Sequence, residues 1–344
     1  MARLRRVDCS GPGIERRRAG RGFVYHEAGQ RVTDAADLAR IRALAIPPAW
    51  TDVWICSLAN GHIQAMGTDA AGRRQYRYHD DWRTRRDREK FDHMLDFARC
   101  LPHLRKVITT DLAGDEPTRA RVLACATRLL DIGFFRIGTE GYAEQNQSYG
   151  LATIQKRHVR LVDGEVRFDY VAKSGKRRFQ AVVDAEVFAL VQALKKRRGG
   201  GPELLAFRDG RRWVDVKSAD INAYIKDATG AEFTAKDFRT WNASVLAAVS
   251  LAVCVEAGSP AARKRAVAWA MKQVSHWLGN TPAVCRSSYV DPRVVDRYLA
   301  GVTVAPALSK LGEGACFGQL STQGPIERAV LDLLDDAPPA SAVA

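Results

Sequence analysis

The sequence predicts an α+β fold, in which a small β-rich N-terminal domain precedes a larger, mainly α-helical domain with one small antiparallel sheet. Short runs of alternating apolar and polar residues lie between residues 52 and 79. From Phe91 onward, apolar residues recur every three or four positions, as on one face of a helix. Asp163-Gly164 separates two further alternating runs, which is a strong hairpin signal. A chain of 344 residues is long enough for about two domains of roughly 150 residues each.

The N-terminal part divides into two segments. Residues 1–22 are rich in arginine and are expected to form a basic arm, whether ordered or disordered. Residues 23–88 are expected to form the β-rich domain, in which Asp34 caps a short helix that ends before Pro47. Its strand-like runs span residues 52–56, 62–67 and 73–79. The charged stretch that follows is expected to be a linker or a helix that crosses between the domains.

The second domain is expected to span residues 89–336, followed by a disordered tail over 337–344. Its first helix should end at Pro102, and its second should begin near Pro117. The alternating runs that follow predict an antiparallel meander, with Lys173 at the tip of its second hairpin.

Start and stop signals place the later helices of this domain. Capping residues are expected at Asp184 and Ser218, and Thr234 with Asp237 fits a capping box that places Arg239 in the first helical turn. Further signals are the Pro260 start and Gly279 stop of one helix and the Asp291-Pro292 start of the next.

Charge and cysteine content narrow the class of protein. The chain has 53 Lys and Arg against 39 Asp and Glu, a net charge of +14. Such a balance is a common footprint of nucleic-acid binding, although unspecific attraction to polyanions gives the same excess. The seven cysteines contain no CxxC pair, which argues against a disulfide framework and for a reducing compartment. Without a run of 18 apolar residues, a membrane span is not expected, and we predict a cytoplasmic protein.

Four residues have the chemistry for phosphoryl transfer without a metal. Tyr289 offers a hydroxyl nucleophile, and Arg136 and Arg239 offer planar cations that donate two parallel hydrogen bonds to phosphate. Lys173 offers an exchangeable proton for a leaving alkoxide. Singly, each residue is more often structural. The sequence has no GxxxxGK[ST] loop, HExxH motif or clustered carboxylates, so neither a nucleotide nor a metal cofactor is predicted.

Six motifs, in order and spacing, resemble those of the type IB DNA topoisomerases in their small bacterial and poxvirus-like form. They are IPPAW (46–50), GRRQYRY (72–78), FFRIG (134–138), YVAK (170–173), KDFRTW (236–241) and LGNTPAVCRSSYVDP (278–292). The resemblance covers nearly the whole chain. It implies the fold that these enzymes share with the tyrosine recombinases.

The resemblance also implies a role for each site residue. Tyr289 would be the nucleophile that forms a 3′-phosphotyrosyl bond, Arg136 and Arg239 the phosphate clamp, and Lys173 the general acid. Asn280 lies nine positions before the tyrosine, where the poxvirus enzymes carry histidine. Asparagine can donate a hydrogen bond to a non-bridging oxygen but brings no charge.

The resemblance further implies DNA contacts through Gln75, Tyr76, Tyr78 and Tyr142. Tyr76 and Tyr78 alternate along one strand face, so a buried sheet face is the competing interpretation. Tyr142 matches a major-groove residue of the poxvirus enzymes, but Thr139 replaces a lysine there.

The expected function is relaxation of supercoiled duplex DNA by a monomeric, C-shaped clamp associated with the nucleoid. The clamp would nick one strand, let it rotate, and reseal it without ATP or metal. A tyrosine recombinase would share this chemistry, but such enzymes usually carry histidine where this chain has Lys236, and they often exchange a C-terminal helix between protomers. A DNA-binding protein without catalysis is the third alternative.

Overall fold

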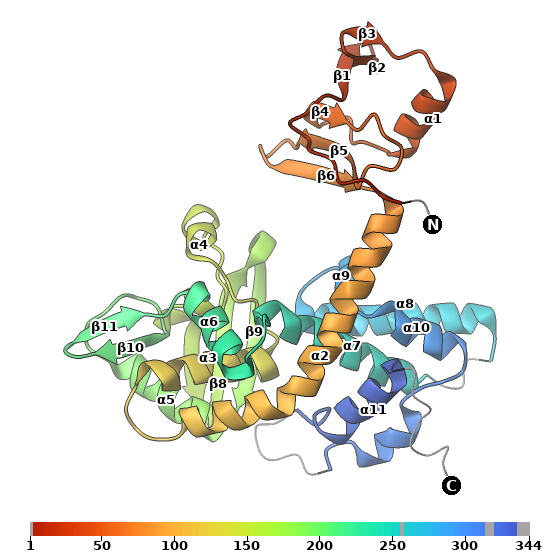
Figure 1. The fold of residues 1–344 in the computed structure, drawn as a ribbon. Helices are drawn as coiled ribbons and strands as arrows, with labels where there is room; N and C mark the ends of the chain where they lie inside the picture. Colours follow the sequence, from red (N-terminus) through yellow and green to blue (C-terminus); the bar gives the residue numbers. More distant parts are fainter. Residues whose placement is uncertain (1–2, 255–257, 314–319, 336–344) are drawn as a thin grey trace. The chain divides into compact units, whose positions relative to one another are not determined.

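The computed structural model describes residues 3–254, 258–313 and 320–335, apart from the side chain of Tyr142. The chain folds into two compact units, Met1–Asp92 and His93–Ala344 (Figure 1). The division after Asp92 and the boundary expected at residue 88 both lie in the long helix α2 (Asp80–Leu112). The predicted tail over 337–344 lies outside the described residues.

The first unit is a six-stranded antiparallel sheet with one helix, α1 (Ala35–Ala43). In spatial order its strands are β3 (Gln30–Arg31), β2 (Gly22–Glu27), β1 (Ile14–Ala19), β4 (Thr51–Ile55), β5 (Ile63–Thr68) and β6 (Arg74–Tyr78). One sheet face and α1 enclose a core of Ile14, Ile41, Val53, Ile55 and Ala65. As predicted, the Asp34 side chain caps α1 by accepting from the Asp37 amide at 2.9 Å.

The prediction of a separate basic arm over residues 1–22 is wrong for its second half. Strand β1 lies there and pairs with β2 and β4 inside the sheet. The strand was not predicted because its sequence is rich in arginine and lacks an apolar alternation. One of these arginines, Arg16, lies on the same face as the buried Ile14 and is stabilised by backbone carbonyls. Arg16 donates to the carbonyls of Pro47 at 3.1 Å and Trp50 at 2.6 Å, and its guanidinium lies 4.1 Å from the Phe23 ring centroid. Arg16 therefore fixes the IPPAW loop, and its partly buried guanidinium costs little because these carbonyls satisfy its donors.

The helix expected to end at Pro102 instead continues to Leu112. Proline removes one backbone hydrogen bond from a helix interior. The apolar stripe nevertheless runs on through Leu104 and Ile108, both almost fully buried. Figure 1 shows that α2 changes direction along its length, as expected for a helix with an internal proline.

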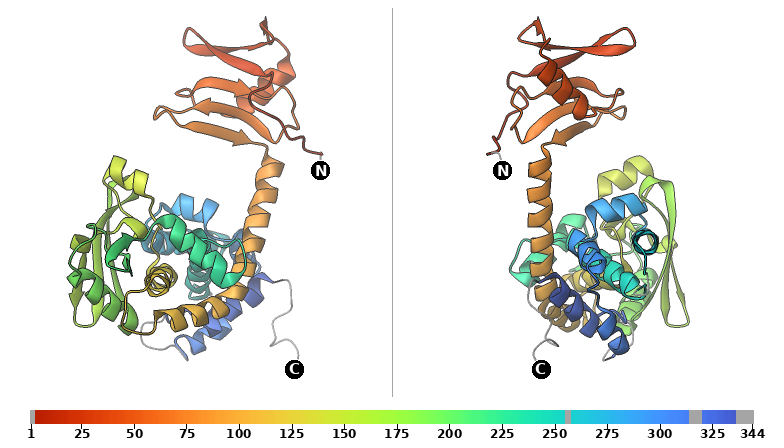
Figure 2. Two further views of the ribbon diagram at one scale, coloured as in Figure 1. Left: turned by 60° about the vertical axis from the view of Figure 1, so that its left-hand side comes forward. Right: turned by 90° about the vertical axis from the view of Figure 1, so that its right-hand side faces the viewer.

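The second unit is mainly helical and contains a three-stranded antiparallel sheet of β7 (Val159–Val162), β8 (Glu165–Ala172) and β9 (Lys176–Val183). One face of this sheet packs against α3 and α5, and the other is open (Figure 2). The helices are α3 (Arg119–Gly133), α4 (Glu140–Asn146), α5 (Ala185–Lys196), α6 (Ser218–Thr229), α7 (Ala235–Ala252), α8 (Pro260–Leu278), α9 (Pro282–Ser288), α10 (Pro292–Leu299) and α11 (Pro325–Leu334). These features confirm the predicted α+β fold class.

Most predicted helix signals in this unit are confirmed, with two corrections. Asp184 and Asp291 cap α5 and α10, and Gly279 ends α8 with a positive φ of 65°. Ser218 is the first residue of α6 rather than its cap, because Lys217 takes that position. Arg239 is the fifth residue of α7 and so lies beyond the first turn.

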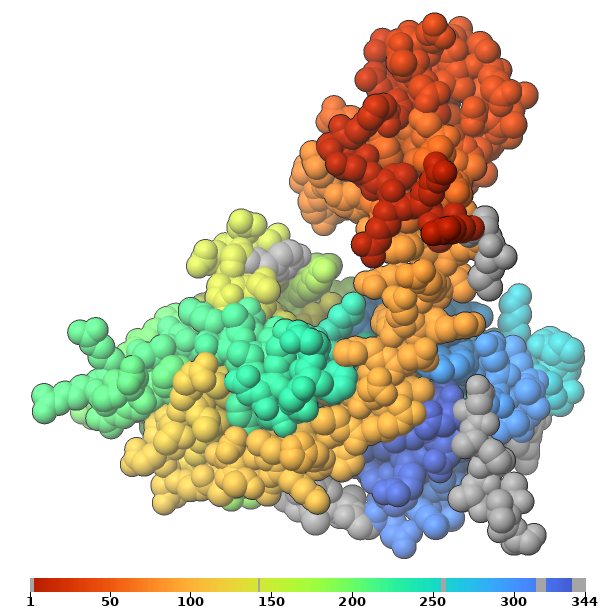
Figure 3. Space-filling model, in the orientation of Figure 1, coloured from red at the N-terminus to blue at the C-terminus, as the bar shows by residue number. Residues whose placement is uncertain are grey.

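A further hairpin, β10 (Ala206–Asp209) with β11 (Arg212–Asp215), was not predicted from the sequence. It projects from the surface of the second unit (Figure 3). Its strands have four residues each, too few for a clear alternating pattern. Among the described residues, no helix is both long and apolar enough to cross a membrane.

Candidate active site

Arg136 lies in the turn that follows α3, and two glycines set the path of this turn. Gly138, with a φ of 73°, runs so close to Gly150 that a Cβ on it would lie 2.6 Å from the Gly150 Cα. The Arg136 carbonyl accepts from the Leu151 amide at 2.8 Å, which pins the turn. This close approach requires glycine in the FFRIG motif and fixes the backbone that carries the Arg136 side chain.

Arg239 projects from α7 into the second unit and is only 5% exposed. The Thr234 amide donates to the Asp237 carboxylate at 2.8 Å, which confirms the predicted capping box at the start of this helix. The Arg239 guanidinium donates to the carbonyls of Phe134 at 2.7 Å and Leu278 at 2.9 Å. Because these carbonyls end α3 and α8, Arg239 holds together the segments that carry the other site residues.

The Nε–H of Arg239 is buried without an acceptor in hydrogen-bond geometry among the described residues. Burial and the nearby charge of Arg136 lower the pKa of Arg239 to about 10. The guanidinium therefore stays protonated at neutral pH. An unsatisfied buried donor is costly unless a ligand supplies the acceptor, and a phosphate oxygen would satisfy it.

Asn280 follows Gly279 at the end of α8 and connects the two arginines. Its Oδ1 accepts from Nη2 of Arg239 at 3.0 Å and also from Nη2 of Arg136. Since both guanidinium groups can only donate, the shared atom is the amide oxygen. The Nδ2 group thus remains available as a donor toward Tyr289.

Tyr289 caps the end of α9, and its amide donates to the Cys285 carbonyl at 3.0 Å. Its ring is half-buried, with the Arg239 guanidinium carbon 5.3 Å from the ring centroid. Burial by itself raises the pKa of the Tyr289 hydroxyl, but Arg239, Arg136 and Asn280 outweigh burial and lower the pKa below its ordinary value. The surroundings therefore stabilise a tyrosinate, as a tyrosine nucleophile requires.

The structure brings together four of the five predicted site residues, Arg136, Arg239, Asn280 and Tyr289. Lys173 begins the short 3₁₀ turn Lys173–Gly175 at the tip of the β8–β9 hairpin, as predicted, and is exposed. Among the described residues, no hydrogen bond or ion pair joins Lys173 to Arg136, Arg239 or Tyr289.

The predicted DNA contacts in the first unit lie on two faces of β6. Tyr76 and Tyr78 are 39% and 40% exposed, and their rings stack with centroids 6.1 Å apart, so the interpretation as a buried face is wrong. Gln75 points to the opposite face and donates to Asp69 at 2.9 Å. Tyr142 belongs to α4, but its side chain lies outside the described part of the structure.

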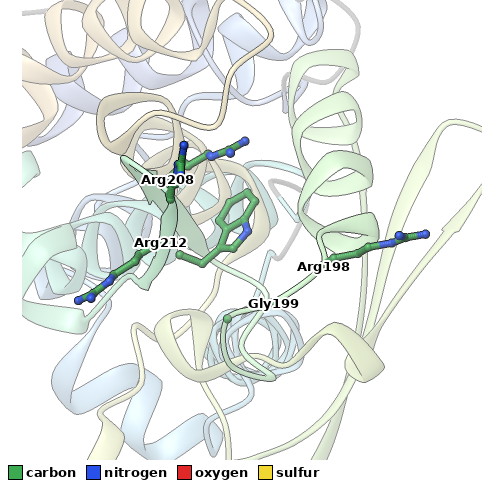
Figure 4. Close-up of a pocket in the computed structure, with 7 residues that line it drawn as sticks. Arg198, Gly199, Arg208 and Arg212 are labelled. Carbon is green, nitrogen blue, oxygen red and sulfur yellow. The ribbon is translucent and has the colours of Figure 1, made fainter.

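A separate pocket of about 590 Å³ lies between the loop after α5 and the β10–β11 hairpin. Its lining includes Arg198, Arg208, Arg212 and Trp213 and none of the five predicted site residues. Figure 4 shows the side chains of the three arginines pointing in different directions, so they do not converge on one ligand position. Among the described residues, no group of three His, Cys, Asp or Glu side chains could hold a metal ion.

Two family models match the chain. The model of the eukaryotic DNA topoisomerase I catalytic core matches residues 79–302, which include all five predicted site residues. The model of the bacterial DNA topoisomerase IB N-terminal domain matches residues 22–69.

Individual relatives agree with these models. DNA topoisomerase 1B of Acanthamoeba polyphaga mimivirus is 33% identical over 83% of this chain and 87% of its own length. DNA topoisomerase 1B of Vaccinia virus (strain Copenhagen) is 21% identical over 67% of this chain and 71% of its own. DNA topoisomerase 1 of Daucus carota is 26% identical over 46% of this chain but only 19% of its own length. The core model and the mimivirus relative each cover most of the chain, which therefore belongs to the type IB DNA topoisomerase family.

Proposed function

We propose that the protein relaxes supercoiled duplex DNA by cutting one strand through Tyr289 and then resealing it. The observation that carries this proposal is the bridge by which Asn280 holds Arg136 and Arg239 together beside the Tyr289 ring. Two fixed guanidinium groups next to a tyrosine whose pKa is lowered are suited to attack on a phosphodiester.

In the cleavage step, the Tyr289 oxygen forms a bond to phosphorus while the bond from phosphorus to the 5′ oxygen breaks. Negative charge builds up on the non-bridging oxygens, where Arg136 and Arg239 donate hydrogen bonds. The Nε–H of Arg239, which has no acceptor among the described residues, and the Nδ2 group of Asn280, which faces Tyr289, are the donors proposed for this purpose. Loss of one such donor costs a typical enzyme about 2.7–4 kcal/mol in the barrier.

The departing 5′ oxygen needs a proton, and Lys173 is the proposed donor. Its position at a hairpin tip lets its side chain extend away from the sheet toward bound DNA. The products are a 3′-phosphotyrosyl bond and a free 5′ hydroxyl strand that can rotate. One ester bond replaces another, so the reverse attack reseals the strand without ATP. The guanidinium groups supply the positive charge that a metal provides in other phosphoryl-transfer sites.

Duplex DNA is the proposed partner of both units. The net charge of +14 and the exposed pair Tyr76 and Tyr78 support this proposal. The pair would contact the duplex from the first unit.

A monomer that acts alone is supported by helix α11, which packs on α7 and α10 of its own chain. Glu327 of α11 accepts from Arg105 at 2.6 Å and from the Trp241 indole at 3.0 Å. A tyrosine recombinase that exchanges its C-terminal helix would instead lend this helix to a neighbour.

Covalent trapping tests the proposed chemistry. Duplex DNA labelled at either end is incubated with wild-type protein and with Tyr289→Phe, then denatured and separated on a gel. Wild type should attach to the 3′ end at the nick and release a 5′ hydroxyl strand, whereas Tyr289→Phe should bind DNA but attach to neither end. Attachment to the 5′ end, or an adduct with Tyr289→Phe, would show that the proposed reaction is wrong.

A further inference from the structure

Arg178 of β9 connects the lysine-bearing hairpin to the end of α8. Its guanidinium donates to the carbonyl of Trp277 at 2.7 Å and to that of His276 at 3.2 Å. The last carbonyls of a helix lack intrahelical partners and carry partial negative charge, so a guanidinium stabilises them well. Asn280 lies just beyond this helix end.

The structure leaves space for this contact by means of a glycine. A Cβ on Gly279 would lie 2.8 Å from Nη1 of Arg178 and 3.2 Å from its Cδ. The Arg178 guanidinium thus lies directly over the turn that leads into Asn280. Any shift of Arg178 would therefore change how the Lys173 hairpin is held against the end of α8.

A second side chain of the same strand makes an equivalent contact. Gln180 donates to the carbonyl of Gly133 at the end of α3, just before the turn that carries Arg136. Strand β9 is therefore attached to two helix ends, each followed by a residue of the candidate site. The opposite strand adds Tyr170, which pairs with Arg178 in the sheet and is almost fully buried.

The contacts of Arg178 indicate a positioning role rather than direct catalysis. Both of its terminal nitrogens donate to backbone carbonyls, and among the described residues Arg178 has no counterpart of the buried, unpartnered Nε–H that Arg239 offers to a phosphate oxygen. Two cross-strand pairs of the β8–β9 hairpin separate Arg178 from Lys173 at the tip. They are Arg177 with Val171 and Lys176 with Ala172. Arg178 is thus close enough to the tip to set the direction in which Lys173 leaves the sheet.

We propose that Arg178 is a positioning residue that orients the Lys173 hairpin against the cluster of Arg136, Asn280 and Arg239. This inference rests on the proposed function. It predicts that loss of Arg178 impairs the step in which Lys173 protonates the leaving oxygen and largely spares DNA binding.

The neighbouring Arg177 provides a matched control. It lies on the same strand but on the opposite face of the sheet. There its guanidinium forms a bidentate ion pair with the Asp169 carboxylate, with both hydrogen bonds at 2.7 Å. Arg177→Met and Arg178→Met remove the same charge one residue apart and retain a similar apolar stem. Only the second removes the contact with α8.

The test compares single-turnover cleavage of two DNA substrates at a site mapped with the wild-type protein. One substrate has the natural 5′ oxygen at the scissile bond, and the other has a 5′-bridging sulfur that leaves without a proton. Arg178→Met should slow cleavage of the oxygen substrate by about 10- to 100-fold, up to the typical contribution of a general acid. Arg178→Met should cleave the sulfur substrate at close to the wild-type rate. On the oxygen substrate, the double variant Arg178→Met/Lys173→Ala should cleave no more slowly than Lys173→Ala alone.

An equal defect on both substrates, or additive defects in the double variant, would overturn the proposal and assign Arg178 to the phosphate or to general stability. Arg177→Met should cleave both substrates like wild type. Thermal unfolding and binding to DNA are measured for each variant. If Arg178→Met does not fold, Arg178→Lys takes its place, because lysine retains the charge but not the planar fork. Its cleavage rates on the oxygen and sulfur substrates are compared in the same way. Absence of any adduct with the wild-type protein would contradict the proposed function itself and is thus a separate outcome.

Discussion

Oδ1 of Asn280 lies 3.0 Å from Nη2 of Arg239 and accepts a hydrogen bond from it. The same oxygen accepts from Arg136. This single acceptor keeps two like charges together beside Tyr289. A neutral histidine has one ring nitrogen that can accept and a protonated one has none, so asparagine is well suited to a site in which both neighbours donate.

We predict that Asn280→Ala slows DNA cleavage by about 10²- to 10³-fold, the usual effect of removing one donor to a transition-state oxygen. The two arginines would also lose their common acceptor. The rate is measured in a single turnover with saturating DNA. His276→Ala, an exposed change in the last turn of α8, which Asn280 follows, serves as the control and should cleave near the wild-type rate. Equal rates for wild type and Asn280→Ala would contradict the assigned role.

The pH dependence of cleavage should reflect the lowered pKa of Tyr289. Arg239 and Arg136 favour the tyrosinate, so the rate should fall as the pH is lowered through the pKa of this group. In Arg136→Ala, one stabilising charge is lost and the pKa of Tyr289 should rise. The rising limb of the pH–rate profile should then move to higher pH, in addition to any loss of rate. A limb that stays in place or moves to lower pH would argue against this coupling.

The docking of α11 should contribute strongly to the stability of the second unit. Arg105 donates to both Asp131 and Glu327, and Asp131 is fully buried. Glu327→Ala would remove the carboxylate that accepts hydrogen bonds from the Arg105 guanidinium and the Trp241 indole. We expect a loss of about 3–5 kcal/mol in the free energy of unfolding, measured in urea.

Asp332→Ala is the matched control for this prediction, because Asp332 is exposed on the same helix. It should change the free energy of unfolding by less than about 0.5 kcal/mol. If both variants were equally stable, the contact of Glu327 with Arg105 would not hold α11 in place.

In the first unit, Tyr76 and Tyr78 should contribute to DNA affinity more than Gln75 does. Their rings are exposed and stacked, whereas Gln75 faces the other side of β6 and is bonded to Asp69. We expect the double change to alanine to weaken duplex binding about tenfold, equivalent to about 1.4 kcal/mol. The measurement is a titration at fixed salt. A larger effect from Gln75→Ala would place the DNA on the opposite face.

The local signals in the sequence were enough to predict the fold class, most helix caps and the hairpin tip at Lys173. These features depend on neighbouring residues, such as Asp34 before α1 or Gly279 after α8. The motifs that carry the family resemblance identified Arg136, Arg239, Asn280 and Tyr289, and the structure places them together.

Other features depended on contacts between distant parts of the chain. Arg16 is stabilised inside the sheet by carbonyls some thirty residues away, so its strand resembled a free basic arm. Pro102 remains within a helix because buried residues on both sides keep packing. Arg178 was not singled out because its partners lie 98 and 99 residues further along the chain.

The most direct test of the central claim is relaxation of supercoiled plasmid by the purified protein in EDTA without nucleotide. We predict a ladder of fully sealed, relaxed topoisomers, and no relaxation by Tyr289→Phe at the same protein concentration. Plasmid that remains supercoiled at concentrations where the wild-type protein demonstrably binds it would contradict the claim that Tyr289 and its arginines cut and reseal DNA unaided.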